Sequence, residues 1–162
     1  MKTYYLTLSQ VFPSTHARAG APTQFEAAFH AGQVFNRGSE CLYRHPKLHT
    51  IRANYEFWAK RFEKIEAGEA CLSIRQWVGK PYGKGSKQRE IVRLTREDGI
   101  GIERLMFDKS LLLPHVNYKP VGIGNLANND GLSLDDWKEW FKHYDLKKPL
   151  AIIHFTKFRY AK

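Results

Sequence analysis

The chain has 162 residues, of which 43% are hydrophobic and 14% aromatic, ample apolar material for the core of one domain over residues 1–162. This composition excludes intrinsic disorder, collagen and coiled coil, and no stretch approaches the roughly 20 uninterrupted apolar residues of a membrane helix. The 26 Lys and Arg residues outnumber the 16 Asp and Glu residues, and the resulting net charge of +10 favours acidic partners such as nucleic acids.

The chain is predicted to open with a strand followed by a short helix. Residues 2–8 alternate and are rich in Tyr, Thr and Leu, which is typical of a strand. Thr23 and Glu26 have the spacing of a capping box, so we expect a helix there that ends near Gly32. Residues 33–46 resemble a loop.

A second strand and a second helix are predicted next. Residues 49–52 form a short extended run, and Asn54 is a plausible N-cap for a helix that ends at residues 67–68. The apolar face of this helix recurs at steps of three and four residues, and we expect it to lie in the core: Tyr55, Trp58, Phe62 and Ile65.

Three further strands are predicted in the centre of the chain. Residues 70–78 and 89–95 form two of them, joined through a loop whose Gly and Pro residues are typical of a hairpin. Residues 100–107 fit the third. Residues 111–129 are expected to be irregular because they contain two prolines and two glycines among few periodic apolar positions.

The chain is predicted to end with a helix and a strand. Ser133 and Asp136 form a second capping box, and residues 150–158 read as the closing strand. Strands therefore bracket the chain without a sustained alternation of strands and helices, which favours an α+β fold with a mixed sheet or small β-barrel. The apolar stripe of the last helix is Leu134, Trp137, Phe141 and Tyr144.

Cysteine and histidine usage indicates neither a disulfide scaffold nor a metal site. Cys41 and Cys71 form no CxxC pair, and we expect both to be buried, reduced thiols. His45 and His49 have helical spacing for a shared metal, but Pro46 disfavours a helix through them. We therefore expect no metal and no cofactor. The polar, alternating start lacks the apolar core of a signal peptide, so a soluble, cytoplasmic protein without a membrane partner is expected.

The excess of positive charge lies in two segments. Residues 37–64 contain seven basic and three acidic residues, and residues 75–96 contain seven basic residues and one acidic residue. Such a patch is typical of a protein that contacts phosphates, although it also fits a solvated surface that confers solubility. In the predicted hairpin, two aromatic residues lie among cations that can stack bases and hold phosphates: Arg75, Trp77, Lys80, Tyr82, Lys84, Lys87 and Arg89. The alternative is that Trp77 belongs to the core and Tyr82 packs within the turn.

A candidate catalytic group lies in the sequence PKLHTIR, residues 46–52. In a strand, Thr50 and Arg52 share one face, and Lys47 at the preceding turn can reach that face. The Arg52 guanidinium together with partial burial can lower the pKa of Lys47 toward the range of a general base. Lys47 can then activate the Thr50 hydroxyl or a water, while Arg52 binds a carbonyl, carboxylate or phosphate. The alternative is that both cations are surface charges.

The order Lys47, Thr50 and Arg52 resembles the K-x-x-T-x-R core of the GxKxxTxR signature of the ASCH (activating-signal-cointegrator homology) domain, in the PUA-like superfamily. The order of predicted elements is also similar over most of the chain. The resemblance implies a small mixed β-barrel with peripheral helices and a cleft lined by the signature residues. It also implies recognition of RNA or modified nucleosides. Some members are amidohydrolases that act on an acylated nucleoside such as N4-acetylcytidine, and others bind or cleave RNA.

This chain departs from the family pattern at two places. His45 replaces the signature glycine, and an inserted loop separates Gly32 from Lys47. In the amidohydrolase members a glutamate before the last helix joins the lysine and threonine, and the corresponding stretch of this chain offers Asp130, which is one methylene shorter. Asp130 with Gly131 also fits a turn before Ser133.

Three functions follow from these patterns. The leading hypothesis is an RNA-binding or nucleotide-binding domain with a basic cleft. The second is a hydrolase, or a ribonuclease, with Lys47 as base, Thr50 as nucleophile or its support, Asp130 as proton shuttle and Arg52 as anion clamp. The third is a module that binds a protein partner. Convergence of the four residues Lys47, Thr50, Arg52 and Asp130 on one cleft, with polar atoms within about 3–4 Å, would favour the enzyme, because general acid–base catalysis requires hydrogen-bond contact. An Asp130 that faces elsewhere would leave the binding function.

Overall fold

The computed structural model describes residues 1–36, 38, 43–108 and 113–162. Within these residues the fold is mixed α+β, as the sequence predicts, and a short 3-10 turn covers Arg96–Asp98. The helices are α1 (Phe25–Asn36), α2 (Tyr55–Glu66), α3 (Ile123–Asn129) and α4 (Leu134–Phe141). The strands are β1 (Lys2–Thr7), β2 (His49–Arg52), β3 (Ala70–Val78), β4 (Lys87–Leu94), β5 (Gly101–Phe107), β6 (Pro114–Val116), β7 (Lys119–Pro120) and β8 (Leu150–His154).

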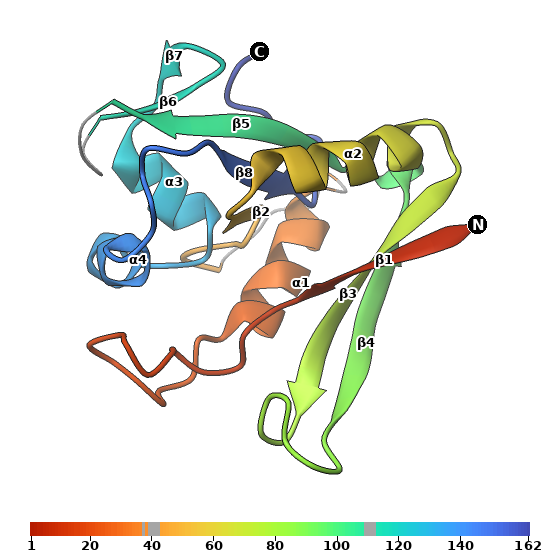
Figure 1. Ribbon diagram of the computed structural model, residues 1–162, viewed down its shortest axis with the longest axis vertical. Coiled ribbons are helices and arrows are strands. Elements are labelled where there is room, and N and C mark those ends of the chain that lie inside the picture. Colours follow the sequence, from red (N-terminus) through yellow and green to blue (C-terminus); the bar gives the residue numbers. More distant parts are fainter. Residues whose placement is uncertain (37, 39–42, 109–112) are drawn as a thin grey trace.

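The strands form two separate sheets (Figure 1). One has the order β1-β3-β4, in which β1 is parallel to β3 and β3 is antiparallel to β4. The other has the order β2-β8-β5-β6-β7 and is antiparallel throughout. The predicted mixture of strand directions is therefore confirmed, whereas the hydrogen bonds of the described strands give two sheets and do not close a barrel.

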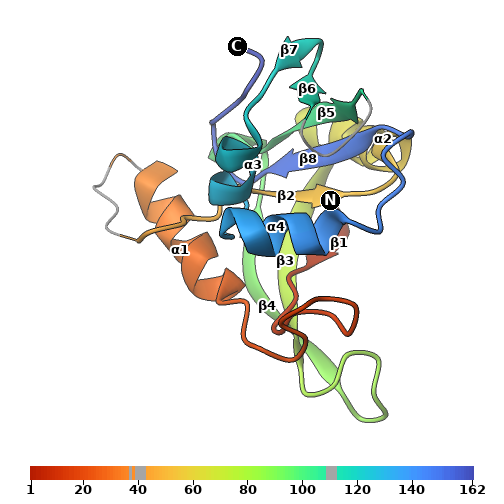
Figure 2. The ribbon, with the colours of Figure 1, turned by 90° about the vertical axis from the view of Figure 1, so that its left-hand side faces the viewer.

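The core contains residues from both sheets, and helix α2 packs against both of them. Helix α2 packs against β3 of one sheet and against β5 and β8 of the other. Its Trp58, Phe62 and Ile65 side chains are buried, so the predicted core role of this aromatic face is confirmed. Strand β8 is buried along its whole length, as expected for a strand paired on both edges. Figure 2 shows α3 and α4 on the side of β8 that is opposite to α2.

Strand β1, strand β2 and helix α2 follow the predicted positions, and Asn54 caps α2 by accepting a hydrogen bond from the Phe57 amide. The predicted capping box of α1 is wrong. The Thr23 hydroxyl donates to the Ser9 carbonyl, and the Glu26 carboxylate pairs with Arg89 at 2.6 Å. Arg89, which is distant in sequence, thus pairs with the Glu26 carboxylate that the local pattern assigned to the cap of α1.

The expectation of an irregular stretch over residues 111–129 is also wrong for its described part. Residues 114–129 contain β6, β7 and α3. Pro114 begins β6 and Pro120 ends the two-residue β7, which are positions where a strand tolerates proline. Gly122 is the N-cap residue of α3. The prolines therefore mark the boundaries of short elements that the sequence pattern did not separate.

The last predicted helix and strand exist with shorter bounds. The Ser133 hydroxyl accepts a hydrogen bond from the Asp136 amide, but the Asp136 carboxylate pairs with Arg18 at 2.6 Å and leaves the capping box half formed. Trp137 and Phe141 are buried, while Leu134 is exposed, so the predicted stripe is narrower. Strand β8 ends at His154.

Two smaller expectations concern the thiols and the membrane. Cys71 is buried and free, as predicted, and Cys41 lies outside the described residues. Within the described ranges, no helix has the length and apolar character needed to cross a membrane.

Candidate active site

The residues just before β2 bring Lys47 beside Asp130. The Lys47 amide donates to the Ala28 carbonyl of α1 at 2.9 Å, and the Leu48 amide donates to the Asn129 carbonyl at 2.7 Å. Lys47 and Asp130 form an isolated antiparallel β-bridge. The backbone thus fixes both residues before any side-chain contact is made.

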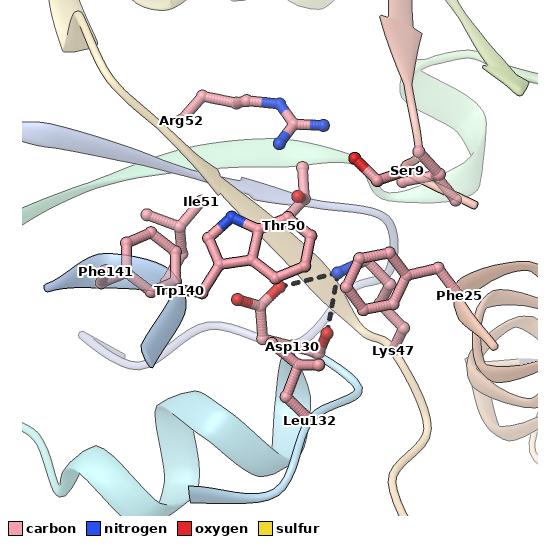
Figure 3. A pocket seen from close by; sticks show the side chains of 11 residues that line it. Ser9, Phe25, Lys47, Thr50, Ile51, Arg52, Asp130, Leu132, Trp140 and Phe141 are labelled. Atoms are coloured by element: carbon pink, nitrogen blue, oxygen red, sulfur yellow. Dashed lines mark hydrogen bonds and ion pairs between the residues drawn. The ribbon is translucent and has the colours of Figure 1, made fainter. Parts of the chain in front are cut away.

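The side chains of Lys47 and Asp130 form a buried ion pair (Figure 3). The Lys47 Nζ atom donates to Asp130 Oδ1 and to the Asp130 carbonyl, both at 2.7 Å. It also lies 3.9 Å from the centre of the Phe25 ring, a distance typical of a cation–π contact. The shorter carboxylate of Asp130 therefore reaches the lysine, because the β-bridge brings the two backbones together.

Burial moves the pKa values of this pair toward each other. Burial lowers the pKa of Lys47, the Asp130 carboxylate opposes that change, and Arg52 adds to it. Burial raises the pKa of Asp130, and Lys47 and Arg52 oppose that change. The sequence predicted Arg52 as the main cause of the lowered Lys47 pKa, but desolvation of the buried amine has the larger effect. Both shifts reduce the cost of passing a proton between Lys47 and Asp130.

Thr50 lies on the same face of β2 and lines a narrow cleft with Lys47, Arg52 and Asp130 (Figure 3). The volume of this cleft is about 10 Å³, which is room for roughly one water molecule. Thr50 is buried, and no hydrogen bond of its hydroxyl to another described residue is found. The hydroxyl is therefore available to a water or a reacting group in the cleft.

Arg52 stands where the narrow cleft meets a second, larger cavity. Its Nη2 atom donates to the Thr7 carbonyl at 2.6 Å, which fixes the guanidinium and leaves other N–H groups for a ligand. Burial lowers the pKa of Arg52, yet a guanidinium stays protonated in proteins. Arg52 and Ser9 line both cavities, so the two cavities adjoin at these residues.

The larger cavity, called here the outer pocket, has a volume of about 740 Å³. Its aromatic lining residues come from β1, α2, β3 and the β3–β4 loop: Tyr5, Trp58, Trp77 and Tyr82. Trp77 and Tyr82 pack against each other with ring centres 4.8 Å apart, although 88% of Tyr82 is exposed. The alternative in which Trp77 belongs to the core is wrong, since it is only partly buried and faces this pocket.

The predicted hairpin residues divide into two groups. Trp77, Lys80 and Tyr82 line the outer pocket together with Arg52. The other four line neither cavity: Arg75, Lys84, Lys87 and Arg89.

Two of those four cations have partners within the protein. Arg75 lies over the Tyr5 ring at 4.4 Å, and Arg89 pairs with Glu26. Lys84 and Lys87 are exposed on the hairpin.

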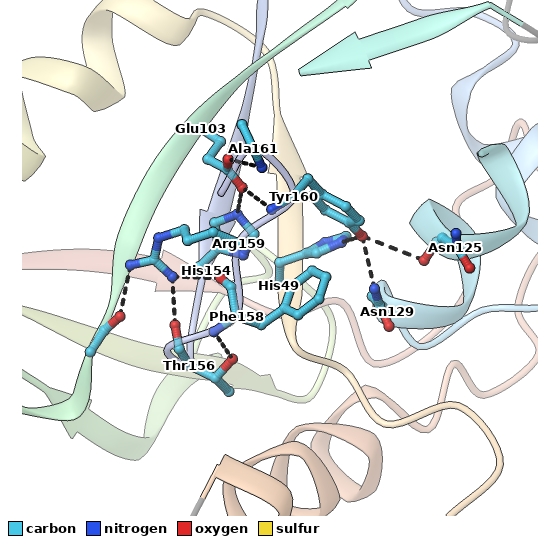
Figure 4. Close-up of polar contacts among 11 residues, drawn as sticks. His49, Glu103, Asn125, Asn129, His154, Thr156, Phe158, Arg159, Tyr160 and Ala161 are labelled. Carbon is cyan, nitrogen blue, oxygen red and sulfur yellow. Dashed lines mark hydrogen bonds and ion pairs between the residues drawn. The ribbon is translucent and has the colours of Figure 1, made fainter. Parts of the chain in front are cut away.

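A buried polar network that the sequence did not indicate adjoins Asp130 through His49, and Figure 4 shows its contacts. The Tyr160 hydroxyl is 2.7 Å from His49 Nε2 and accepts from the Asn129 side chain at 3.0 Å. His49 Nδ1 is buried without a hydrogen-bond partner and lies 3.9 Å from Asp130 Oδ1. Burial, together with the charge of His154, holds the pKa of His49 well below its usual value, so the ring facing Asp130 is neutral.

The same network anchors the end of the chain. Glu103 accepts hydrogen bonds from the Tyr160 amide at 2.8 Å and the Ala161 amide at 3.0 Å, and its carboxylate lies 2.7 Å from His154 Nε2. Burial alone would raise the pKa of Glu103, but these hydrogen bonds outweigh it and lower the pKa. The signal for this network was a histidine in each of two predicted strands, His49 and His154, which the sequence pattern alone does not distinguish from core residues.

The histidines considered for a metal have other partners. His45 Nδ1 lies 2.7 Å from the Asn128 side-chain oxygen, and His49 is bound to Tyr160. Among the residues that the structure describes, no three His, Cys, Asp or Glu side chains gather as ligands.

Comparison with known proteins adds no relative. No protein-family model, no curated protein and no solved structure matches this chain. The ASCH-like order of Lys47, Thr50 and Arg52 therefore remains a resemblance.

Gly32 controls how closely α1 approaches Lys47. A Cβ atom at Gly32 would lie 2.6 Å from the Lys47 carbonyl oxygen, closer than atoms pack. We expect Gly32→Ala to lower the free energy of unfolding by about 1–3 kcal/mol, as overpacking does, and to displace Lys47. Urea denaturation measures this loss. Gly124→Ala is the control because a Cβ there meets nothing within 4 Å. Equal stability of the two variants would contradict the close approach.

Proposed function

We propose that the chain is a cytoplasmic hydrolase of the ASCH type that removes an acyl group from a nucleoside-like or nucleotide-like substrate. The observation that carries the proposal is the buried contact of 2.7 Å between Lys47 Nζ and Asp130 Oδ1 beside the Thr50 hydroxyl. Titratable groups with shifted pKa values in a cleft are typical of acid–base chemistry. Lys47, Thr50, Arg52 and Asp130 line one cleft, and this convergence supports an enzyme over a domain that only binds.

The proposed reaction is the hydrolysis of an amide. The neutral amine of Lys47 takes a proton from the Thr50 hydroxyl or from a water in the cleft, and the resulting nucleophile attacks the acyl carbon. The bond between that carbon and nitrogen breaks, and the proton returns through Lys47 and Asp130 to the leaving amine. If Thr50 attacks, a water then cleaves the acyl–threonine ester. One water is consumed, and a carboxylic acid and an amine are released.

Arg52 has the position of an electrostatic partner in this reaction. Its guanidinium lines the cleft beside Thr50 and is fixed by the Thr7 carbonyl. A fixed cation near the developing oxyanion lowers the barrier without reorganising during the reaction. Lys47 and Asp130 therefore move the proton, while Arg52 holds the charge.

The Thr50→Val variant tests the role of the hydroxyl. We expect the wild-type chain to release acetate and cytidine from N4-acetylcytidine, and Thr50→Val to reduce kcat/KM at least about 100-fold. Chromatography of the released cytidine measures both. Thr3→Val is the matched control, since Thr3 is a strand threonine that lines neither cavity. Equal turnover by Thr50→Val would reject a role of the Thr50 hydroxyl, and no release of cytidine by the wild-type chain would reject the proposed reaction.

A second candidate function is the binding of single-stranded RNA without chemistry. The exposed Lys84 and Lys87 on the β3–β4 hairpin favour it, because they extend positive charge beyond the outer pocket. Such binding weakens steeply with salt as counterions are released. An RNA titration without binding at low salt would exclude it.

A further inference from the structure

We infer that the outer pocket binds a nucleotide with its phosphate in preference to the neutral nucleoside. The inference rests on the proposed function, because it names the class of substrate for the same site. It concerns the part of the substrate that does not react, which lies outside the narrow cleft.

The charge of the outer pocket is the first argument. Its lining contains two cations, Arg52 and Lys80, and no Asp or Glu side chain. A pocket with cations and no carboxylate attracts an anionic group. A phosphate can pair with these cations, whereas a neutral nucleoside has no charge to pair with them. Lys80 is exposed, so its ammonium can move to meet a phosphate.

The aromatic walls are the second argument. The packed pair of Trp77 and Tyr82 offers ring faces on which a base can stack, and stacking accepts any base because every base has a π-face. Tyr82 also has a positive φ of 56°, which is unfavourable for a bulky side chain. Strained residues of this kind gather at ligand sites. The volume of about 740 Å³ falls within the range of small-ligand pockets.

The residues shared by the two cavities orient the ligand. The cleft has room for only about one water, so the base must remain in the outer pocket, and the acyl group is the part of the ligand that faces the cleft. Arg52 lines both cavities, whereas Lys80 lines only the outer pocket. We therefore place the acyl group beside Arg52 and the phosphate toward Lys80.

Calorimetric titration with cytidine 5′-monophosphate (CMP) and with cytidine tests the inference. We expect CMP to bind at least 10-fold more tightly than cytidine at low salt, and this advantage to shrink as salt is added. Lys80→Ala should remove most of the advantage, and Trp77→Ala should weaken both ligands. Lys119→Ala is the control, because Lys119 is an exposed lysine on β7 that lines neither cavity. Equal affinities for CMP and cytidine, or equal losses in Lys80→Ala and Lys119→Ala, would overturn the inference.

The nucleotide can be free or part of a single RNA strand, and a cytidine tetranucleotide separates these two sources. Binding tighter than that of CMP, reduced by Lys84→Ala, assigns the pocket to a strand; binding no tighter assigns it to the free nucleotide. Both outcomes support a nucleotide. The hydrolase proposal is tested separately, since CMP carries no acyl group. A preference for CMP without turnover of acetylated cytidine supports the inference and rejects the hydrolase. Turnover without a preference for CMP supports the hydrolase and rejects the inference.

Discussion

Lys47→Met alone is expected to lower the free energy of unfolding by about 3–5 kcal/mol, because it leaves the Asp130 carboxylate buried without its partner. The double variant Lys47→Met with Asp130→Leu should recover most of this loss. Two apolar side chains need no partner in the core, and replacing a complete buried ion pair is often neutral or stabilising. Urea denaturation of the wild-type chain, both single variants and the double variant measures the coupling between the two residues.

An exposed ion pair provides the control for this cycle. Lys64 and Glu69 are 3.1 Å apart, and both side chains are more than half exposed. We expect Lys64→Met to change the free energy of unfolding by less than about 1 kcal/mol, since solvent screens such pairs. If Lys47→Met lowers the free energy of unfolding no more than Lys64→Met does, the buried Asp130 carboxylate is not destabilised by losing its partner.

The second large effect concerns the pH dependence of hydrolysis. Only the unprotonated amine of Lys47 can accept a proton, so we expect kcat/KM to rise with pH through the lowered pKa of Lys47. Lys47→Arg keeps a positive charge next to Asp130 but cannot lose its proton. Its kcat/KM should fall by about 10²–10⁴, the usual contribution of general acid–base catalysis, and the rise with pH should disappear. Initial rates from pH 5 to about 10 measure both effects.

A variant that folds but is inactive distinguishes loss of the base from loss of the fold. The double variant at Lys47 and Asp130 should unfold cooperatively and yet release no cytidine. If either this variant or Lys47→Arg retains the wild-type rate and pH profile, Lys47 is not the base.

Local sequence signals predicted the elements that carry the site. Strand β2 follows from an extended run, and Asn54 marks the start of α2 by its side-chain cap. The two-residue period of a strand places Thr50 and Arg52 on one face, and the structure brings both to the same cleft. These features depend on neighbours along the chain, which is why a single sequence is enough to predict them.

Local sequence signals could not predict the contacts between segments that are distant in sequence. Asp130 was selected through a family resemblance, but its contact with Lys47 depends on a β-bridge between segments 83 residues apart. The ion pair of Arg89 with Glu26 gives one predicted ligand-binding cation a partner within the protein, and the two residues are also distant in sequence. His49 was considered only as a metal ligand, because its partner Tyr160 lies 111 residues further along the chain.

The position of β8 has a consequence for biosynthesis. Although β2 is made early, its partner in the sheet is β8, the last strand of the chain. During translation the backbone groups of β2 that pair with β8 stay unpaired until residues 150–154 have left the ribosome. Such exposed strand edges promote aggregation. A chain truncated before Leu150 should therefore be insoluble rather than partly active, and the cleft should form only after β8 has been made.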